Sequence, residues 1–472
     1  MNIDNKHITG QQDSGEYRNR LATVNSEGKR VWIYPKKPSG RFYSARTWVS
    51  YFLLLVLFAT PFLRINGHPV LLLNILEGKF YLLGFRFWPQ DFYIFGLVFI
   101  SMIIFIVLFT VVYGRLFCGW ICPQTIFMEM VFRKIEYWIE GDAAQQKRLD
   151  AEPLSLEKLM KKSTKHVIFF SISFLIGNLF LSYIIGTDPL MHIVTAPPTQ
   201  HIAGFSAMII FSLLFYFVFS SFREQVCTIV CPYGRFQGVL LDKDSIAVHY
   251  DFVRGEPRTK GGLKKDSTAG HCIDCHQCVH VCPTGIDIRN GTQLECINCT
   301  ACMDACDTIM DKVKLPKGLI RYASYNELAR GVKQLFTPRS VGYTGILFLI
   351  VSLVVFFLVS RSPLETTILR TPGIMYHVMD NGDIKNLYNI KIMNKTYKEM
   401  TIRLEADQEM VNVKLLNPIT VMSDDMAESV FFLTIPGTSL NQRKTPVSLL
   451  VFGNDELMSK VKTTFISPGL SK

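Results

Sequence analysis

The spacing of the cysteines is the feature that most constrains this chain, because all twelve of them fall in four short motifs. Two motifs have the form C-x2-C-x2-C-x3-C, and the second begins 24 residues after the first. This is the spacing of bacterial ferredoxins that carry two 4Fe–4S clusters. The sequence therefore predicts a protein that transfers electrons.

The same spacing predicts which cysteines share a cluster. Three cysteines separated by two residues bind one cluster, and the fourth binds the partner cluster. We therefore expect crossed ligation. The chain departs from these ferredoxins at Asp307, which stands where the second motif would have proline. The expected ligands are Cys272, Cys275, Cys278 and Cys306 for one cluster, and Cys296, Cys299, Cys302 and Cys282 for the other.

Other uses of these cysteines fit the pattern less well. Such regular arrays are typical of metal ligands rather than of disulfides, and structural zinc would need only four thiolates per site. Cys272-Ile-Asp-Cys275-His276 also matches the C-x-x-C-H pattern of covalent haem attachment. Here, however, these cysteines belong to a longer array, which favours iron–sulfur clusters.

Long apolar segments predict a membrane protein. Crossing a bilayer takes roughly 20 apolar residues, and five segments of about this length carry no Lys, Arg, Asp or Glu. The segment Phe117–Ile139 is apolar only in part, so we expect an amphipathic helix at the interface or against the bundle. The five expected spans are Thr47–Leu63, Phe92–Tyr113, His166–Gly186, Ala203–Phe222 and Val341–Ser360.

The distribution of positive charge predicts the orientation. Arg115 to Lys165 contains nine Lys and Arg residues, whereas Thr187–Ile202 contains none. We therefore expect a cytoplasmic N-terminus and, after five crossings, a periplasmic C-terminal domain. The net charge of +11 lies mostly beside the spans, where it fits anionic membrane lipid rather than nucleic acid.

These observations predict an α-helical membrane bundle with an inserted two-cluster ferredoxin domain and a C-terminal immunoglobulin-like β-sandwich. The sandwich follows from several short β-prone runs that are separated by turn residues. The expected parts are an N-terminal segment (1–46), a four-span membrane domain in two repeats (47–240), the ferredoxin domain (241–340), a fifth span (341–360) and the sandwich (361–472).

The remaining cysteines form two C-x3-C pairs, each followed directly by proline and each closing one repeat of the membrane domain. Proline favours an extended residue before it and suits the first turn of a helix. We therefore expect Cys122 and Cys231 at helix N-caps, where thiolate is favoured. With Cys118 and Cys227 they offer soft ligands for Cu(I) or a redox-active dithiol. The alternative is that the four thiols only pack as small apolar side chains. We expect Trp120 to be an interfacial anchor.

The chain resembles the FixG/RdxA/CcoG family of cytochrome c oxidase accessory proteins. The resemblance covers Trp32-Ile-Tyr-Pro35, Phe87-Trp-Pro-Gln-Asp-Phe92, the paired C-x3-C-P motifs, the eight-cysteine ferredoxin and Gly318-Leu-Ile-Arg-Tyr-Ala323. It implies a location in the bacterial inner membrane and reduction of Cu(II) to Cu(I) for assembly of cbb-type oxidases, with assembly factors as partners. It also implies that copper is substrate or transient ligand at Cys118, Cys122, Cys227 and Cys231.

Two other functions stay open. One is a general quinol-linked relay to a respiratory partner, and the other is a copper-binding assembly scaffold without turnover. The electron donor is unknown, since no G-x-G-x-x-G dinucleotide site occurs in the sequence.

Overall fold

The computed structural model describes residues 23–468, apart from residues 25–26, 28, 66, 76, 83–84, 89–90, 259–269, 332–336, 361, 374, 397, 424 and 441. Residues 1–22 of the predicted N-terminal segment and Arg361, the start of the predicted sandwich, lie outside the described residues. The chain divides into two compact units, one made mainly of residues 1–352 and the other mainly of residues 353–472.

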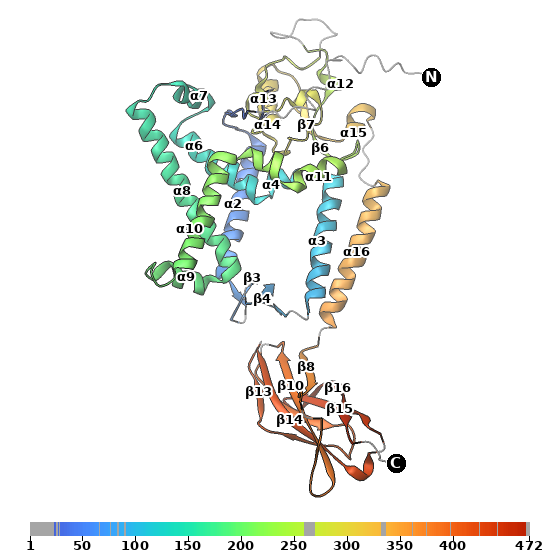
Figure 1. The fold of residues 1–472 in the computed structure, drawn as a ribbon. Coiled ribbons are helices and arrows are strands. Elements are labelled where there is room, and N and C mark those ends of the chain that lie inside the picture. The colour runs from blue at the N-terminus through green and yellow to red at the C-terminus, as the bar shows by residue number, and fades with distance from the viewer. Residues whose placement is uncertain are drawn as a thin grey trace. The chain divides into compact units, whose positions relative to one another are not determined.

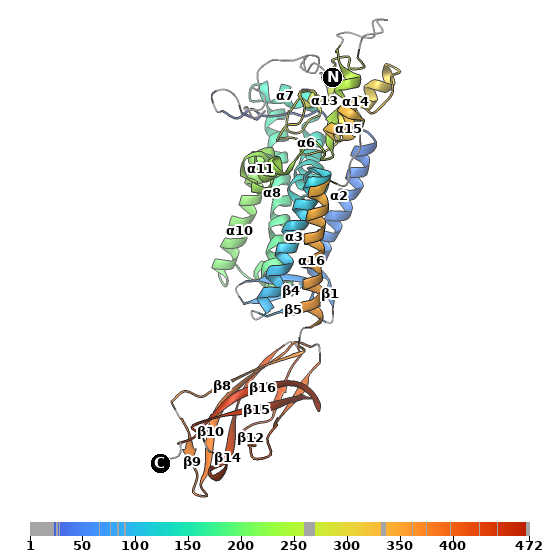
Figure 2. The same cartoon turned by 90° about the vertical axis from the view of Figure 1, so that its right-hand side faces the viewer.

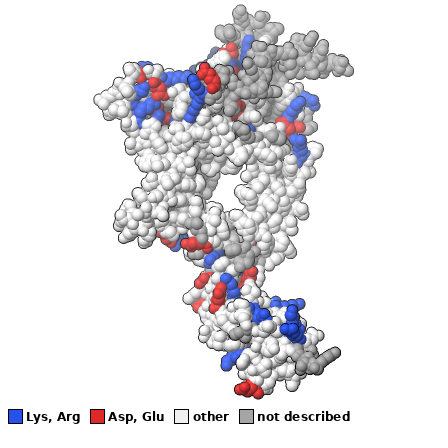
Figure 3. Space-filling view, viewed as in Figure 1, with Lys and Arg blue, Asp and Glu red and all other residues white. Residues whose placement is uncertain are grey.

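Five helices are long and apolar enough to cross a membrane, as the apolar segments predict, so the chain is a membrane protein. On the face shown in Figure 3, the described surface over the middle of these helices carries no Lys, Arg, Asp or Glu. The helices are α2 with its 3-10 extension (Arg41–Phe62), α3 (Phe92–Tyr113), α8 (Leu156–Ile185), α10 with the π-helix η4 (Ile202–Phe222) and α16 (Pro338–Val359).

Helix α8 begins ten residues before the predicted span at His166, because a local signal starts it early. The Ser155 hydroxyl accepts a hydrogen bond from the Lys158 backbone N–H at 3.2 Å, which is an N-cap. The lysine-rich first turns therefore belong to the same helix as the apolar span.

The segment predicted as one amphipathic helix, Phe117–Ile139, is broken into several pieces. It packs against the bundle, burying Phe127, Met128 and Phe132 in one core with Phe169 and Phe219. The break at Cys122 follows from the proline after it. The pieces are α4 (Leu116–Trp120), α5 (Pro123–Ile126), the π-helix η3 (Phe127–Phe132) and α6 (Arg133–Ile139).

The connections between spans contain structure that the sequence analysis did not anticipate. The first connection contains strands β3 (Leu71–Asn74), β4 (Lys79–Leu82) and β5 (Phe85–Phe87), which form a three-stranded sheet. The second contains helix α9 (Thr187–Thr195). These strands are only three or four residues long, too short for the alternation of a typical strand to emerge.

The ferredoxin region lies at one end of the spanning helices (Figure 1 and Figure 2). Strand β6 (Ala247–Tyr250) pairs with β7 (Ile320–Ala323), and helices α13 (Gln277–His280) and α14 (Ala301–Lys312) carry parts of the cysteine motifs. Asp304 of α14 accepts hydrogen bonds from the Phe42 and Tyr43 backbone N–H groups in the first turn of α2. The first span is thus capped by a ferredoxin carboxylate.

The second unit is a sandwich of two antiparallel sheets, as predicted. Its core contains Tyr388, Phe431 and Phe465, all fully buried. Strands β8, β9 and β13 lie outside the β-prone runs of the sequence, because β9 and β13 are only two and three residues long and β8 shows no regular alternation of buried and exposed residues. One sheet has β8 (Leu364–Arg370), β9 (His377–Val378), β10 (Asp383–Asn394), β12 (Asn412–Leu415) and β14 (Met426–Pro436), and the other has β11 (Met400–Ala406), β13 (Ile419–Val421), β15 (Lys444–Gly453) and β16 (Glu456–Ile466).

Candidate functional site

The eight ferredoxin cysteines line two cavities, which share Cys278. Cavity A is lined by Cys272, Cys275, Cys278 and Cys306, with Met310, Leu319 and Ile320 among its apolar walls. Cavity B is lined by Cys282, Cys296, Cys299 and Cys302, and Cys278 also reaches it. Each grouping mixes cysteines of the two motifs, in the crossed manner that the spacing predicts.

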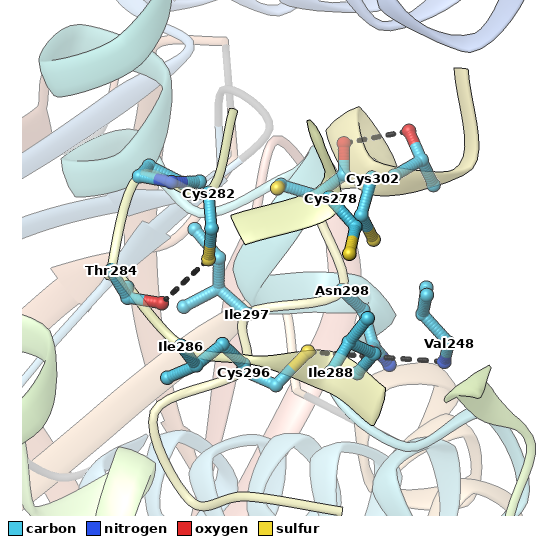
Figure 4. A pocket seen from close by; sticks show the side chains of 13 residues that line it. Val248, Cys278, Cys282, Thr284, Ile286, Ile288, Cys296, Ile297, Asn298 and Cys302 are labelled. Carbon is cyan, nitrogen blue, oxygen red and sulfur yellow. Dashed lines mark hydrogen bonds between the residues drawn. The ribbon is translucent and has the colours of Figure 1, made fainter. Parts of the chain in front are cut away.

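Figure 4 shows sulfur atoms of both motifs around cavity B, with Ile286, Ile288 and Ile297 beside them. Four thiols in an apolar enclosure are the donor set that a 4Fe–4S cluster requires. Both cavities therefore fit such a cluster, and their cysteines are the residues that would hold it. The assignment of each cysteine to one cluster stays a prediction.

The backbone repeats the same unusual conformation in both motifs. The residues two and four positions after the first cysteine have positive φ in each case: Asp274 (52°) and His276 (54°), then Asn298 (53°) and Thr300 (66°). Such φ values are uncommon outside glycine, and alternating conformations of this kind point backbone N–H groups at a bound anion. Cysteine spacing contains no signal for this strain.

A buried arginine holds the loop beside cavity A. Arg289 donates to Asp287, whose Oδ2 lies 2.6 Å from Nη2, and it also bonds to Asp274 and His276. These bonds hold the pKa of Asp287 below its usual range, although burial alone would raise it. Asp307 directly follows Cys306, the last cysteine of the second motif, and accepts a hydrogen bond from the Gly318 backbone N–H at 2.9 Å. The residue in place of proline therefore has a structural partner.

The C-x3-C-P pairs adopt the local structure that proline predicts. Cys122 is the N-cap of α5, and Cys231 is the N-cap of α11 (Pro232–Leu240). Their ψ angles of 122° and 110° are extended. Cys118 lies in α4, and Cys227 lies in the π-helix η5 (Val226–Val230).

The two pairs converge, which their sequence separation did not reveal. Burial raises the pKa of Cys227 to about 12, and the nearby Cys122, Cys118 and Cys231 thiols add to the effect. Burial likewise raises the pKa of Cys118 to about 11, with Cys122 next in size and Cys231 also contributing. We call these four residues the thiol site. Within the described part of the chain, no three His, Cys, Asp or Glu side chains are close enough to hold a single ion.

Polar groups from both repeats line the thiol site. The Cys118 thiol donates to Gln237 Oε1 at 3.2 Å, and the Gln237 side chain is fully buried in α11. One turn earlier, the Tyr233 hydroxyl lies 2.7 Å from the Thr110 hydroxyl of α3. The second repeat therefore orients a cysteine of the first.

The thiol site abuts the loop of cavity B, at a contact that we call the junction. Gly119, which lies between Cys118 and Cys122, packs directly on the backbone of Ile297 and Asn298. Its carbonyl oxygen accepts a hydrogen bond from Arg46 Nε at 2.6 Å. Only a residue without a side chain allows this approach.

Two further residues connect the thiol site to the ferredoxin region. Trp120 Nε1 donates to the Tyr322 hydroxyl at 3.1 Å, and that hydroxyl donates to the Asn298 carbonyl at 3.1 Å. Arg115 donates to the carbonyl oxygens of Leu294 and Gly234, and its charge acts on Cys118 and Cys296. The expectation that Trp120 is an interfacial anchor stays a prediction, and the structure adds that its indole N–H has a protein partner at the junction.

Family models match the ferredoxin region, part of the membrane domain and the sandwich. Residues 222–325 match the 4Fe-4S dicluster domain, residues 95–141 match a 4Fe-4S binding domain, and residues 354–468 match the IG-like fold at the C-terminal of FixG. A solved structure, of a FixG-related protein from Vibrio parahaemolyticus, is 19% identical with a TM-score of 0.21, and the match covers 23% of this chain and 99% of that chain.

Whole-chain relatives are more similar. The nitrogen fixation protein FixG of Rhizobium meliloti is 33% identical over 80% of this chain and 80% of that protein. Protein RdxB of Cereibacter sphaeroides is 32% identical over 88% of this chain and 91% of that protein, and protein RdxA of the same organism is 32% identical over 80% and 82%. This chain is therefore an iron–sulfur electron-transfer protein of the membrane that belongs to the FixG/RdxA/RdxB family.

Proposed function

We propose that the protein reduces Cu(II) to Cu(I) at the thiol site and so supplies Cu(I) for assembly of a cbb-type cytochrome c oxidase. The observation that supports this most is the junction, where Gly119 brings the thiol site against the cysteine loop of cavity B. A site for copper is then adjacent to a site for an electron carrier. The two 4Fe–4S clusters, when bound, supply one-electron carriers.

The chemistry at the thiol site follows from the ligands. Each Cu(II) takes up one electron and becomes Cu(I), and soft thiolates favour the reduced ion over the oxidised one. Thiols bind metal as thiolates, so Cys118 and Cys227, whose pKa values burial raises, release protons as copper binds. Before copper binds, Gln237 Oε1 accepts a hydrogen bond from the Cys118 thiol, and this bond is lost when the thiol releases its proton.

The proposed orientation has the ferredoxin region in the cytoplasm and the sandwich in the periplasm of a bacterial inner membrane. Its support is the concentration of Lys and Arg between Arg115 and Lys165. Copper ions and oxidase assembly factors are the proposed partners, and the electron donor is an unidentified reduced carrier.

The test is the double variant Cys122→Ser with Cys231→Ser, purified anaerobically. We expect the cluster spectrum to stay intact while Cu(II) no longer reoxidises the reduced protein. Met128→Leu with Met130→Leu is the matched control, because it removes two other buried sulfur side chains of the same segment. Full copper reduction in the cysteine variant would mean that Cys122 and Cys231 only pack and take no part in the reduction.

The same assay separates the alternative functions. A general relay would be reoxidised by its protein partner and not by Cu(II). A scaffold would bind copper through the thiol site without reoxidation of the clusters.

A further inference from the structure

Helix α2 contains two arginines, and one of them is buried. Arg41 is exposed, whereas Arg46 has an exposed fraction of only 3%. Arg46 Nε donates to the Gly119 carbonyl oxygen at the junction, but Nη2 is buried without a hydrogen-bond partner. Among the described residues Arg46 forms no ion pair, and the carboxylate of Glu129 pairs with Arg133 instead, at 2.9 Å. A buried charge is costly unless an opposite charge compensates for it.

The position of Arg46 beside cavity B indicates what compensates for its charge. Arg46, Glu129 and Cys299 line a third cavity, which we call cavity C. Burial raises the pKa of the Cys299 thiol to about 11, and the charge of Arg46 is the largest effect that lowers it, whereas Glu129 adds to the increase. A 4Fe–4S cluster with four thiolate ligands is an anion, so Cys299 would place that negative charge beside Arg46.

Cavity A lacks a cation of this kind among the described residues that line it. Its arginine, Arg289, is bonded to two carboxylates, those of Asp274 and Asp287. Cavity A also has an exposed ligand, Cys275, whereas none of the four cysteines expected for cavity B is exposed. Water stabilises added negative charge and burial disfavours it. Without a compensating cation, an added electron would therefore favour cavity A over cavity B.

We propose that Arg46 raises the reduction potential of the 4Fe–4S cluster in cavity B and so draws electrons from cavity A toward the thiol site. A fixed cation favours the reduced form, because that form carries one more negative charge. One electron leaves the cluster in cavity A and reduces the cluster in cavity B, without a proton or a further reactant. This role depends on the two clusters and not on copper reduction at the thiol site.

The test compares Arg46→Gln with the wild-type chain, both purified whole in detergent without oxygen. Glutamine can still donate a hydrogen bond to the Gly119 carbonyl oxygen, but it carries no charge. A redox titration followed by paramagnetic resonance gives the two midpoint potentials, and the signal that Cys302→Ser perturbs identifies the cluster in cavity B.

We expect Arg46→Gln to lower the midpoint potential of the cluster in cavity B alone. A unit charge about 10 Å from another, at an effective dielectric constant of about 20, shifts an equilibrium by roughly tenfold. The ratio of reduced to oxidised cluster at a fixed potential should therefore fall about tenfold, which is about 59 mV for a one-electron couple.

Three matched variants separate charge from packing. Arg46→Lys keeps the charge and should restore most of the wild-type potential. Glu129→Gln removes the carboxylate that lines cavity C with Cys299, so it should raise the potential instead. Arg41→Gln removes an exposed cation of the same helix and should change neither potential, because solvent screens that charge.

An unchanged potential in Arg46→Gln, or an equal fall for both clusters, would overturn the proposal. The same fall in Arg46→Lys as in Arg46→Gln would assign Arg46 a purely structural role. If Arg46→Gln fails to hold the cluster in cavity B, Glu129→Gln decides, since a rise supports the proposal and no change contradicts it. None of these measurements involves copper, so a failure here differs from a failure of copper reduction at the thiol site.

Discussion

Gly119→Ala tests whether the junction brings the thiol site and cavity B together. A Cβ at this position would lie 2.8 Å from the Asn298 carbonyl oxygen, 2.9 Å from its carbonyl carbon, and closer still to the Ile297 carbonyl oxygen. All three are backbone atoms, so no side-chain rotation can relieve the clash. The loop would have to move by about 1 Å to restore ordinary contact distances.

The expected cost combines two opposing effects. Extra volume in a packed site destabilises by about 1–3 kcal/mol, while alanine in place of glycine in helix α4 returns up to about 1 kcal/mol. A net loss of about 1–2 kcal/mol should therefore remain. The displaced loop carries Cys296 and Cys299, so we also expect slower reoxidation of the reduced protein by Cu(II).

The assay follows the iron–sulfur absorbance anaerobically, first during urea unfolding and then after addition of Cu(II). Gly96→Ala is the matched control, because a Cβ at this helical glycine meets nothing within 4 Å. Its stability should stay the same or rise. If Gly119→Ala behaves like Gly96→Ala in both measurements, the junction does not have the role assigned to it.

Three further predictions follow from the structure. Cys282→Ser should perturb the paramagnetic resonance of the cluster in cavity B, and loss of the other cluster's signal would contradict crossed ligation. Burial lowers the pKa of His249 to about 4, so the unfolded chain binds more protons than the folded chain as pH falls below about 6.5. The free energy of unfolding should therefore drop by about 1.3 kcal/mol between pH 7.5 and 5.5. In His249→Gln, the urea midpoint should no longer show this pH dependence. A reporter fused after Leu315 should be active only as a cytoplasmic reporter and one fused after Leu470 only as a periplasmic one, and the same sidedness at both points would refute the proposed topology.

Local signals account for what could be predicted from the sequence. Spans depend on continuous apolar runs, so all five emerged, although α8 begins ten residues before the predicted span. The N-caps at Cys122 and Cys231 followed from the prolines after them. Strand β10 buries alternate residues along most of its length and falls on a β-prone run, whereas β8 shows no such alternation and was missed.

Long-range contacts account for what could not be predicted. Cys118 and Cys227 are 109 residues apart (227 − 118), and no pattern in either repeat indicates that they lie close together in the fold. Tryptophan is a typical residue of the membrane interface, but the hydrogen-bond partner of Trp120 is Tyr322, which is 202 residues away in the sequence. Such contacts exist only once the repeats and the ferredoxin region have packed.

The buried charges of η3 and α6 explain how the two repeats keep their register. In the sequence, Glu129, Arg133 and Glu136 predict a polar helix face, yet all three are buried. Glu129 accepts a hydrogen bond from Arg133 of the same segment at 2.9 Å, while Arg133 and Glu136 also meet charges of the second repeat, just before Cys227. Arg133 lies 3.9 Å from Glu224, and Arg223 bonds to Glu136.

This network has an effect beyond pairing of charges. Burial disfavours ionisation of Glu136, but Arg223 and Lys165 outweigh it and hold the pKa of Glu136 below its usual range. Removing one partner of a buried ion pair costs about 3–5 kcal/mol, because the other charge is left without compensation. A shift of one repeat against the other would incur this cost at Glu136, whereas Glu224 also pairs with Arg30 at 3.0 Å. The ion pairs therefore fix the relative position of the segments that carry Cys122 and Cys227, and convergence of the thiol site is a consequence of buried charge as much as of cysteine placement.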